Sequence, residues 1–240
     1  MKDDTTNLSG LHELQTADWA DRLERLPAED AREILNGLPA PKVAVILSEL
    51  PAREAARLLE AFSEDRIVSW LQMLPSHVAA ALADSLSASR RKDLLAALPP
   101  DQSAAVMALL RYPSDSAGGI MDNRFLAMRA DQTVEACLAE LRASPRQRND
   151  DLLYVYVTDN ARRLVGVVSL RELVFAPAER RLSEIMNQEV RFLRVTDHQE
   201  EIARQLQHYH FLGLPVVDQE ERLVGVVKIR DAIRVAQTEA

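Results

Sequence analysis

The first half of the chain repeats one pattern of apolar and polar positions every twelve residues. A Leu-Pro pair starts five of the seven units, and Phe62-Ser63 and Leu86-Ser87 start the other two. An apolar pair follows eight residues after each start. The Leu-Pro pairs are Leu26-Pro27, Leu38-Pro39, Leu50-Pro51, Leu74-Pro75 and Leu98-Pro99, and the apolar pairs run from Ile34-Leu35 to Val106-Met107.

Each of these units predicts one short helix and a corner. Proline is tolerated in the first helical turn, serine can cap a free N–H there, and a residue that precedes proline avoids the helical conformation. The residues in between are rich in Ala, Leu, Arg and Glu, which are good helix formers. Because a helix of about two turns is unstable alone, we expect the units to stack into an all-α superhelix over residues 18–110.

The second half alternates short apolar runs with amphipathic segments, and does so twice. Leu164-Val-Gly-Val-Val-Ser169 matches Leu223-Val-Gly-Val-Val-Lys228 at an offset of 59, and Ile120-Met121 matches Ile185-Met186 at an offset of 65. Each copy predicts a β-α-β-β-α unit with hairpin turns rich in Asp, Asn, Arg and Glu. The predicted strands are 125–128, 153–158, 164–169, 190–195, 214–217 and 223–228, and the predicted helices are 133–142, 170–175, 199–208 and 229–238.

The two patterns meet in the stretch Arg111–Met121, which reads Arg-Tyr-Pro-Ser-Asp-Ser-Ala-Gly-Gly-Ile-Met. Pro113 and Gly118-Gly119 interrupt regular structure, and the Ser-Asp-Ser between them suits a turn or a helix cap. We therefore predict a multidomain α and α/β protein with a hinge. The expected parts are an N-terminal segment 1–17, an α-superhelical domain 18–112, a hinge 113–121, a first unit 122–180 and a second unit 181–240.

Composition narrows the classes of function. Of the 240 residues, 47% are hydrophobic and 28% charged, as in ordinary soluble proteins. The net charge is −8, and the first 120 residues hold 18 acidic and 12 basic side chains. This excess of acid argues against nucleic-acid binding as the main role. It is compatible with a hard divalent cation, although a solvated acidic surface is the more common meaning.

The chemistry-bearing residues are few. Cys137 is the only cysteine, which excludes a disulfide within one chain and predicts a reducing cytoplasm. Cys137 falls on the apolar register of a predicted helix, so we expect a packed thiol. We find no Ser-His-Asp arrangement, Gly-rich phosphate loop or metal-spaced His/Glu pair, and we do not expect an enzyme. No signal peptide is evident, and no run approaches the roughly 20 apolar residues of a membrane span.

Residues 120–237 resemble a tandem CBS pair. The resemblance rests on Leu-Pro-Val-Val-Asp at 214–218, on the two Arg-Leu-Val-Gly-Val-Val blocks, and on the strand-to-helix steps Ser169-Leu-Arg-Glu172 and Lys228-Ile-Arg-Asp231. CBS pairs commonly bind adenine nucleotides between the copies, through a step that usually reads Gly-x-x-Ser/Thr-x-x-Asp. In that step the hydroxyl bonds phosphate and the carboxylate takes the ribose hydroxyls.

Neither copy keeps this step intact. The first has Ser169 but Glu172 in place of Asp, and the second has Asp231 but Lys228 in place of the hydroxyl. The resemblance implies that Arg171 serves phosphate. It also implies that Phe211 and Pro215 form an adenine wall. Helix caps and core contacts are the alternative explanation for the six candidate residues, Ser169, Arg171, Glu172, Phe211, Pro215 and Asp231.

The whole chain resembles the cytosolic region of MgtE-type magnesium transporters. The most specific part is the joint, where family members carry Tyr-Pro-x-x-Ser-Ala-Gly-x-x-Met. The resemblance implies a cytoplasmic, homodimeric Mg²⁺ sensor at the cytosolic face of the inner membrane. In such a sensor, Mg²⁺ bridges acidic faces of the superhelix and the CBS pair and closes the pore of a membrane domain. Asp231 and Glu200 are the candidate Mg²⁺ ligands, and the candidate dimer contacts are Val174, Phe175, Ile233 and Val235.

Several positions depart from the family pattern. Arg230 and Arg234 stand where carboxylates are expected, and His210 stands where an acidic residue is frequent. These cations suggest that salt bridges, rather than Mg²⁺, hold the acidic superhelix. The family continues into a membrane domain, whereas this sequence stops at Ala240, so a truncated or a free-standing protein is expected. The alternatives are a stand-alone soluble CBS protein that senses ATP, ADP or AMP to regulate a partner, and a structural interaction protein that binds neither.

Overall fold

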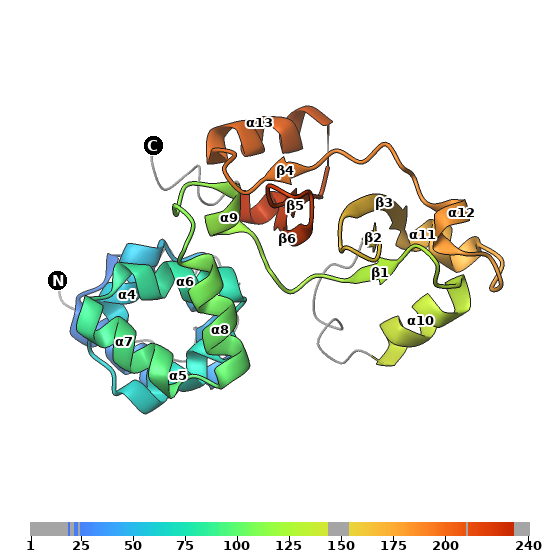
Figure 1. Cartoon of the computed structure of the whole chain (residues 1–240). Coiled ribbons are helices and arrows are strands. Elements are labelled where there is room, and N and C mark those ends of the chain that lie inside the picture. The colour runs from blue at the N-terminus through green and yellow to red at the C-terminus, as the bar shows by residue number, and fades with distance from the viewer. Residues whose placement is uncertain (1–18, 20–21, 24, 144–153, 210, 233–240) are drawn as a thin grey trace. The chain divides into compact units, whose positions relative to one another are not determined.

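The computed structural model describes residues 19, 22–23, 25–143, 154–209 and 211–232 (Figure 1). The chain forms two compact units, one that ends at Leu110 and one that begins at Arg111. Among the described residues, no helix is long and apolar enough to cross a membrane.

The first unit is a series of short helices whose starts are twelve residues apart, as the repeat predicts. The prolines differ slightly from the prediction, because they lie one residue before the helix. Pro27 has an extended backbone (φ −54°, ψ 148°), and its carbonyl accepts the first helical hydrogen bond, from the Ala31 N–H at 3.1 Å. The helices are α2 (Ala28–Gly37), α3 (Ala40–Glu49), α4 (Ala52–Leu59), α5 (Glu64–Leu71), α6 (Ser76–Ser85), α7 (Ala88–Ala97) and α8 (Pro100–Leu109).

Each helix packs mainly against the helix two places further along the chain. Helix α4 contacts α6, α6 contacts α8, and α3 and α5 contact α5 and α7 in the same way. The apolar pairs supply the core, since Leu35, Leu47, Leu59 and Leu71 are all fully buried. In the last unit the first residue of the pair, Val106, is buried and Met107 is 47% exposed. Figure 1 shows the resulting superhelix, in which α4 to α8 turn about a common axis. The predicted all-α superhelix is confirmed.

Long polar side chains donate hydrogen bonds to carbonyls at the C-terminal ends of helices that lie three units earlier in the chain. Arg66, on α5, donates from Nη2 to the carbonyl of Asn36 at 3.1 Å. Gln102, on α8, donates to the carbonyl of Leu71 at 2.8 Å. Both donors occupy the fifth position of their units. A helix end leaves carbonyls without partners, so these side chains tie one turn of the superhelix to the next.

The second unit contains two three-stranded sheets of identical topology. In each sheet the first strand runs parallel to the second, and the second runs antiparallel to the third. The strands are β1 (Ala127–Arg129), β2 (Tyr154–Thr158), β3 (Leu164–Ser169), β4 (Leu193–Arg194), β5 (Gly213–Val217) and β6 (Leu223–Lys228). The longer helices are α10 (Val134–Ala143), α11 (Leu170–Phe175) and α13 (Gln199–Tyr209). The predicted CBS pair is confirmed, and β3, α11 and β6 have their predicted bounds.

The two hairpin turns are built identically around an aspartate. Asp159 Oδ1 accepts from the N–H groups of Ala161 and Arg163, and Oδ2 accepts from Arg163 Nε at 2.8 Å. Asp218 makes the equivalent bonds 59 residues later. Each turn also places one residue at positive φ, Arg162 at 64° and Glu221 at 60°.

The first helical turn of each copy packs against the sheet of the other copy. Helix α9 (Ala117–Ile120) contacts β4 and β6, whereas α12 (Leu182–Ile185) contacts β3. Bridges in the same sense join Asp122 to Val226 and Asn187 to Val167.

Candidate functional site

The ligand step of the first copy is a closed capping box. Ser169 is the N-cap of α11, and its hydroxyl accepts from the Glu172 N–H at 3.1 Å and donates to Glu172 Oε2 at 2.7 Å. The same carboxylate oxygen accepts from the Ser169 N–H at 2.9 Å. The hydroxyl and then the backbone bond from Ser169 hold the pKa of Glu172 below its usual value. Arg171 lies exposed beside this box.

The ligand step of the second copy has the opposite character. Asp231, the counterpart of Glu172, is only 5% exposed. Lys228 ends β6, and its Nζ lies 3.8 Å from Oδ2 of Asp122. Asp122 is buried and receives the Arg124 N–H on Oδ1 at 3.0 Å, with Arg124 Nε 3.7 Å away. The second step therefore holds a buried carboxylate, Asp231, and a partly buried ammonium that lies near the buried carboxylate of Asp122.

The two residues predicted as an adenine wall lie in different settings. Pro215 is buried in β5, opposite Val226 of β6. Phe211 is half-buried, and its ring lies 5.8 Å from the ring of Tyr209, over which Arg191 stacks at 3.9 Å. The wall stays a prediction, and the Arg191–Tyr209 pair is a feature that the sequence reading missed.

The predicted metal ligands come from separate elements. Glu200 is exposed in the first turn of α13, and its N–H points at His198 Nδ1 at 3.5 Å, whereas Asp231 is buried after β6. No group of three or more His, Cys, Asp or Glu side chains within the described ranges is placed to hold a metal ion. Their role as Mg²⁺ ligands stays a prediction.

Some of the other predicted residues are described by the structure, and some are not. Arg230 is exposed, and Val174 and Phe175 are 58% and 81% exposed on α11. His210, Ile233, Arg234 and Val235 lie outside the described residues.

The joint is folded onto the second copy. The N–H groups of Ala117 and Gly118 donate to the carbonyls of Asp197 and Val195 at 2.7 and 2.9 Å. The Gln199 N–H donates in return to the Asp115 carbonyl at 2.8 Å. The side chains of Asp115 and His198 are 3.1 Å apart, Oδ2 to Nε2. Residues from Asp115 onward thus form part of the CBS pair.

Glycine is required twice within the joint. A β-carbon at Gly118 would overlap the ring of Tyr112, and one at Gly119 would overlap the carbonyl of Pro113. Tyr112 and Pro113 therefore fold directly over the glycine pair. The sequence signalled chain breaking here, but not this close packing.

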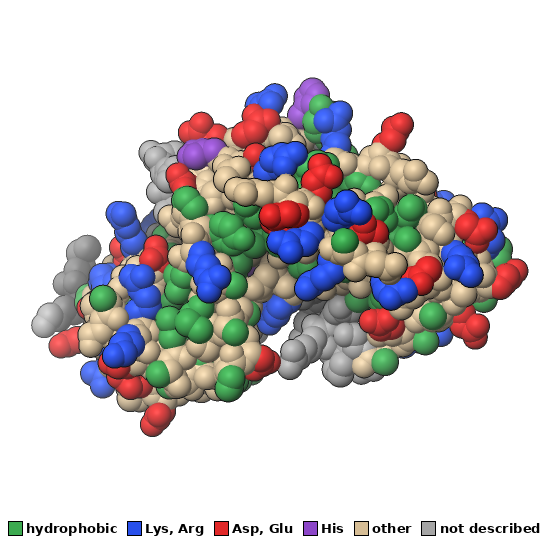
Figure 2. All heavy atoms as spheres, viewed as in Figure 1, with side chains coloured by type: hydrophobic (Ala, Val, Ile, Leu, Met, Phe, Trp, Pro, Cys, Tyr) green, Lys and Arg blue, Asp and Glu red, His purple; other side chains and the backbone are tan. Residues whose placement is uncertain are grey.

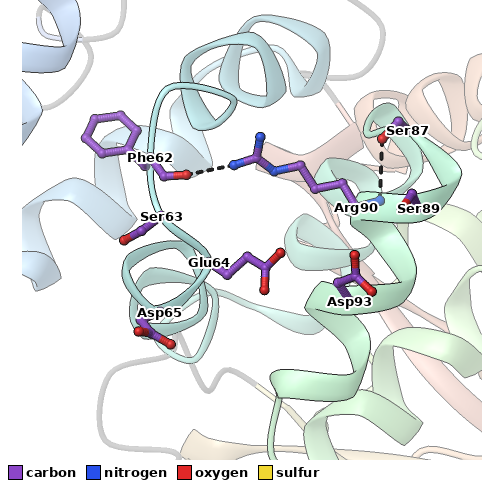
Figure 3. Close-up of a pocket in the computed structure, with 8 residues that line it drawn as sticks. All are labelled: Phe62, Ser63, Glu64, Asp65, Ser87, Ser89, Arg90 and Asp93. Atoms are coloured by element: carbon purple, nitrogen blue, oxygen red, sulfur yellow. Dashed lines mark hydrogen bonds between the residues drawn. The ribbon is translucent and has the colours of Figure 1, made fainter.

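A surface hollow of about 650 Å³ lies between the starts of α5 and α7 (Figure 3). Its polar lining is acidic and hydroxylic, and Glu64 extends toward the helix that carries Asp93. Arg90 is the lining cation, but its guanidinium is occupied by the carbonyls of Leu59, Glu60 and Phe62 at 3.3, 3.1 and 2.7 Å. The lining residues are Phe62, Ser63, Glu64, Asp65, Ser87, Ser89, Arg90 and Asp93.

From composition alone, a solvated acidic surface is the more common meaning of the acid excess. Glu64 and Asp65 do stand in the first turn of α5, where a negative charge is favourable. Their gathering with Asp93 depends on the packing of α5 against α7, which no local pattern reveals. On the face shown in Figure 2, acidic and basic side chains are interspersed, so the acid excess does not form one continuous field there.

A helical-repeat unit followed by a CBS pair defines a class of regulatory module. Its candidate ligand-binding segments, Ser169–Glu172 and Lys228–Asp231 here, lie where a strand leads into a helix. The sequence pattern of the MgtE intracellular N domain matches residues 14–115, and that of the CBS domain matches 117–179 and 182–237. The chain belongs to the MgtE family and corresponds to the family's cytosolic part.

Solved structures agree with this assignment. The cytosolic domain of the Mg²⁺ channel MgtE in complex with ATP is 36% identical with a TM-score of 0.87, and the match covers 95% of this chain and 92% of that chain. The soluble part of a magnesium transporter is 26% identical with a TM-score of 0.79, and the match covers 95% and 89%.

Curated relatives are longer than this chain. The magnesium transporter MgtE of Thermus thermophilus is 44% identical over 137 residues, which is 57% of this chain and 30% of the relative. The magnesium transporter MgtE of Bacillus subtilis is 36% identical over 139 residues, 58% of this chain and 31% of the relative. The matched region thus spans less than a third of these transporters.

Proposed function

We propose that this chain is the regulatory module of an MgtE-type magnesium transporter and that Mg²⁺ changes the equilibrium between its open and closed arrangements. The observation that carries the proposal is the match over 95% of the chain to the cytosolic domain of a Mg²⁺ channel. A cytosolic location and a membrane pore as partner are part of the proposal, and the similarity to magnesium transporters supports both. A ligand shifts such an equilibrium only through its different affinity for the two states, so closure requires a Mg²⁺-dependent contact.

The pivot of this motion is proposed to lie at Leu110–Arg111, two residues before the predicted hinge 113–121 begins. The division into two units falls between these residues. The backbone bonds of Asp115, Ala117 and Gly118 to the second copy support motion of the joint together with the CBS pair.

Small-angle scattering tests the sensing proposal. The radius of gyration is expected to be smaller in about 10 mM MgCl₂ than in the presence of a chelator. It is expected to stay unchanged when NaCl of equal ionic strength replaces the MgCl₂. Glu64→Gln with Asp93→Asn is expected to weaken the response. The matched control is Glu29→Gln with Asp30→Asn, which removes two exposed acids from the first turn of α2. One radius of gyration under all conditions contradicts the proposal.

Nucleotide binding is proposed as a second input at the first copy. Ser169, Arg171 and Glu172 lie together at a helix N-terminus, and the relative with TM-score 0.87 is a complex with ATP. Calorimetry with ATP, ADP and AMP tests this, with loss of heat expected in Arg171→Ala. A stand-alone nucleotide sensor is not favoured, because the similar proteins are parts of magnesium transporters.

Dimerisation is proposed through α11. Phe175 is 81% exposed and Val174 58%, and apolar side chains this exposed frequently mark protein contacts. Sedimentation equilibrium tests the proposal. Phe175→Ser is expected to raise the dimer dissociation constant, while Val45→Ser, at an exposed valine of α3, leaves it unchanged. A parent that sediments as a monomer overturns the proposal.

A further inference from the structure

The pseudo-symmetry of the CBS pair allows the two ligand steps to be compared position by position. Asp122 and Asn187 are equivalent at the offset of 65, since each bridges the middle of the third strand of a sheet, at Val226 and Val167. Their side chains act alike, because Asp122 Oδ1 accepts from the Arg124 N–H at 3.0 Å and Asn187 Oδ1 accepts from the Glu189 N–H at 2.9 Å.

The side chains at two pairs of equivalent positions differ in charge, and both positions change together. At the first sheet these positions hold neutral Asn187 and, at the end of the third strand, neutral Ser169. The second sheet pairs Asp122 with Lys228, the counterpart of Ser169 at the offset of 59. Both members change together, from two neutral polar groups to an anion and a cation. A charged residue at one position alone would leave a partly or fully buried charge without its counter-charge.

Burial makes this pair more than a surface contact. The Asp122 side chain is 2% exposed and that of Lys228 is 18% exposed, whereas Asn187 is exposed. Arg124 approaches the other carboxylate oxygen at 3.7 Å, but its side chain is 45% exposed. Asp231 adds a second buried carboxylate to the step in the second copy, whereas Glu172 in the first is exposed and held by Ser169.

We propose that the Asp122–Lys228 ion pair is an internal substitute for a ligand, which fills the step of the second CBS copy and makes that copy reject phosphate-bearing ligands. A phosphate there would meet the negative charge of Asp122 and Asp231 and find no hydroxyl at position 228. It could reach the Lys228 ammonium only by separating it from a buried carboxylate, which is unfavourable. The pair thus determines specificity, and it confines nucleotide to the first copy where the proposed function places it.

A double-mutant cycle tests the pair without any ligand. Asp122→Asn and Lys228→Ser are measured singly and together by urea unfolding. Each single variant is expected to lower the unfolding midpoint. The double variant, which carries the residues of the first copy, is expected to recover most of the loss. Arg124→Ala is the control for a half-exposed cation and is expected to have a smaller effect than Lys228→Ser. Strictly additive losses overturn the proposal.

Nucleotide titration tests the consequence for specificity. The titrations use a background with Arg171→Ala, which removes the first copy's proposed phosphate contact. In this background the Asp122→Asn/Lys228→Ser variant is expected to bind ATP at least tenfold more tightly than the background protein. Unchanged affinity overturns the proposal, as does tight ATP binding by the second copy with both residues intact. The double-mutant cycle requires neither Mg²⁺ nor nucleotide. If the proposed Mg²⁺ sensing failed, the two substitutions would still be non-additive, so the failure of sensing can be told apart from the failure of the ion-pair proposal.

Discussion

The thioether of Met121 lies directly over the backbone of Gly225, so close that a β-carbon on Gly225 would overlap the sulfur. Met186 lies over Gly166 in the same way in the other sheet. Each methionine belongs in sequence to one copy and packs on the glycine of the other. These two contacts pack the exchanged helical turns α9 and α12 against β6 and β3, the third strands of the sheets of the opposite copies.

Alanine at either glycine is therefore expected to destabilise the CBS pair. Gly225→Ala and Gly166→Ala each force a methionine out of a packed site, at a cost of about 1–3 kcal/mol. Chemical denaturation measures the change. Gly37→Ala is the control, because no atom lies within 4 Å of its added β-carbon; it is expected to be neutral or to stabilise by about 0.5–1 kcal/mol. Equal effects at all three glycines would contradict the packing argument.

Arg90 is expected to contribute more to stability than an arginine in a surface ion pair. Its guanidinium serves three carbonyls at the end of α4, and the loss of hydrogen bonds to a charged group costs about 1.5–3 kcal/mol. Arg57→Ala is the matched control, since Arg57 pairs with Glu54 where both side chains are more than 40% exposed, a pair worth about 0–1 kcal/mol. Thermal unfolding of Arg90→Ala and Arg57→Ala compares the two.

Periodic features were predictable because they are local. The twelve-residue repeat fixed each helix start of the first unit from α2 to α8, since proline or serine at the start and an apolar pair eight residues later act within one unit. The Leu-Val-Gly-Val-Val runs likewise predicted β3 and β6 with their observed bounds. Turn aspartates such as Asp159 were visible for the same reason.

The features that position the candidate sites were not predictable, because they join segments distant in sequence. Arg90 reaches carbonyls 28–31 residues earlier, and Asp122 meets Lys228 across the whole CBS pair. The change of offset from 65 for Ile-Met to 59 for the strands reflects the longer segment between α10 and β2 than between α13 and β5. The exchange of α9 and α12 between the copies has no such local signal in the sequence. Only the folded chain shows that position 228 faces position 122.

The single thiol is expected to be inert in the folded protein. Cys137 is fully buried on α10, and burial raises its pKa to about 11. The thiolate is the reactive form, so modification requires local or global opening. At pH 7.5 a disulfide reagent should react at least about 100-fold more slowly in buffer than in denaturant. Fast reaction of the native protein would show that α10 opens readily.

The capping box at the first ligand step predicts a dependence of stability on pH. Hydrogen bonds from the Ser169 hydroxyl and backbone hold the pKa of Glu172 below its usual value. A carboxyl whose pKa is lower in the folded state contributes stability above its unfolded pKa of about 4.3, and that contribution is lost as the pH falls through the folded value. Glu172 is exposed, so solvent limits the size of the effect.

Ser169→Ala is therefore expected to cost about 0.5–2 kcal/mol at pH 7, and to raise the pKa of Glu172 toward its usual value. The difference in stability from the parent should shrink as the pH falls from 5 to 3. Carboxyl ¹³C shifts follow Glu172 directly. Ser169→Thr keeps the hydroxyl and should restore both properties, while Ser183→Ala, at an exposed serine of α12, should change neither. A Glu172 pKa that does not move in Ser169→Ala would contradict the role of the Ser169 hydroxyl in lowering it.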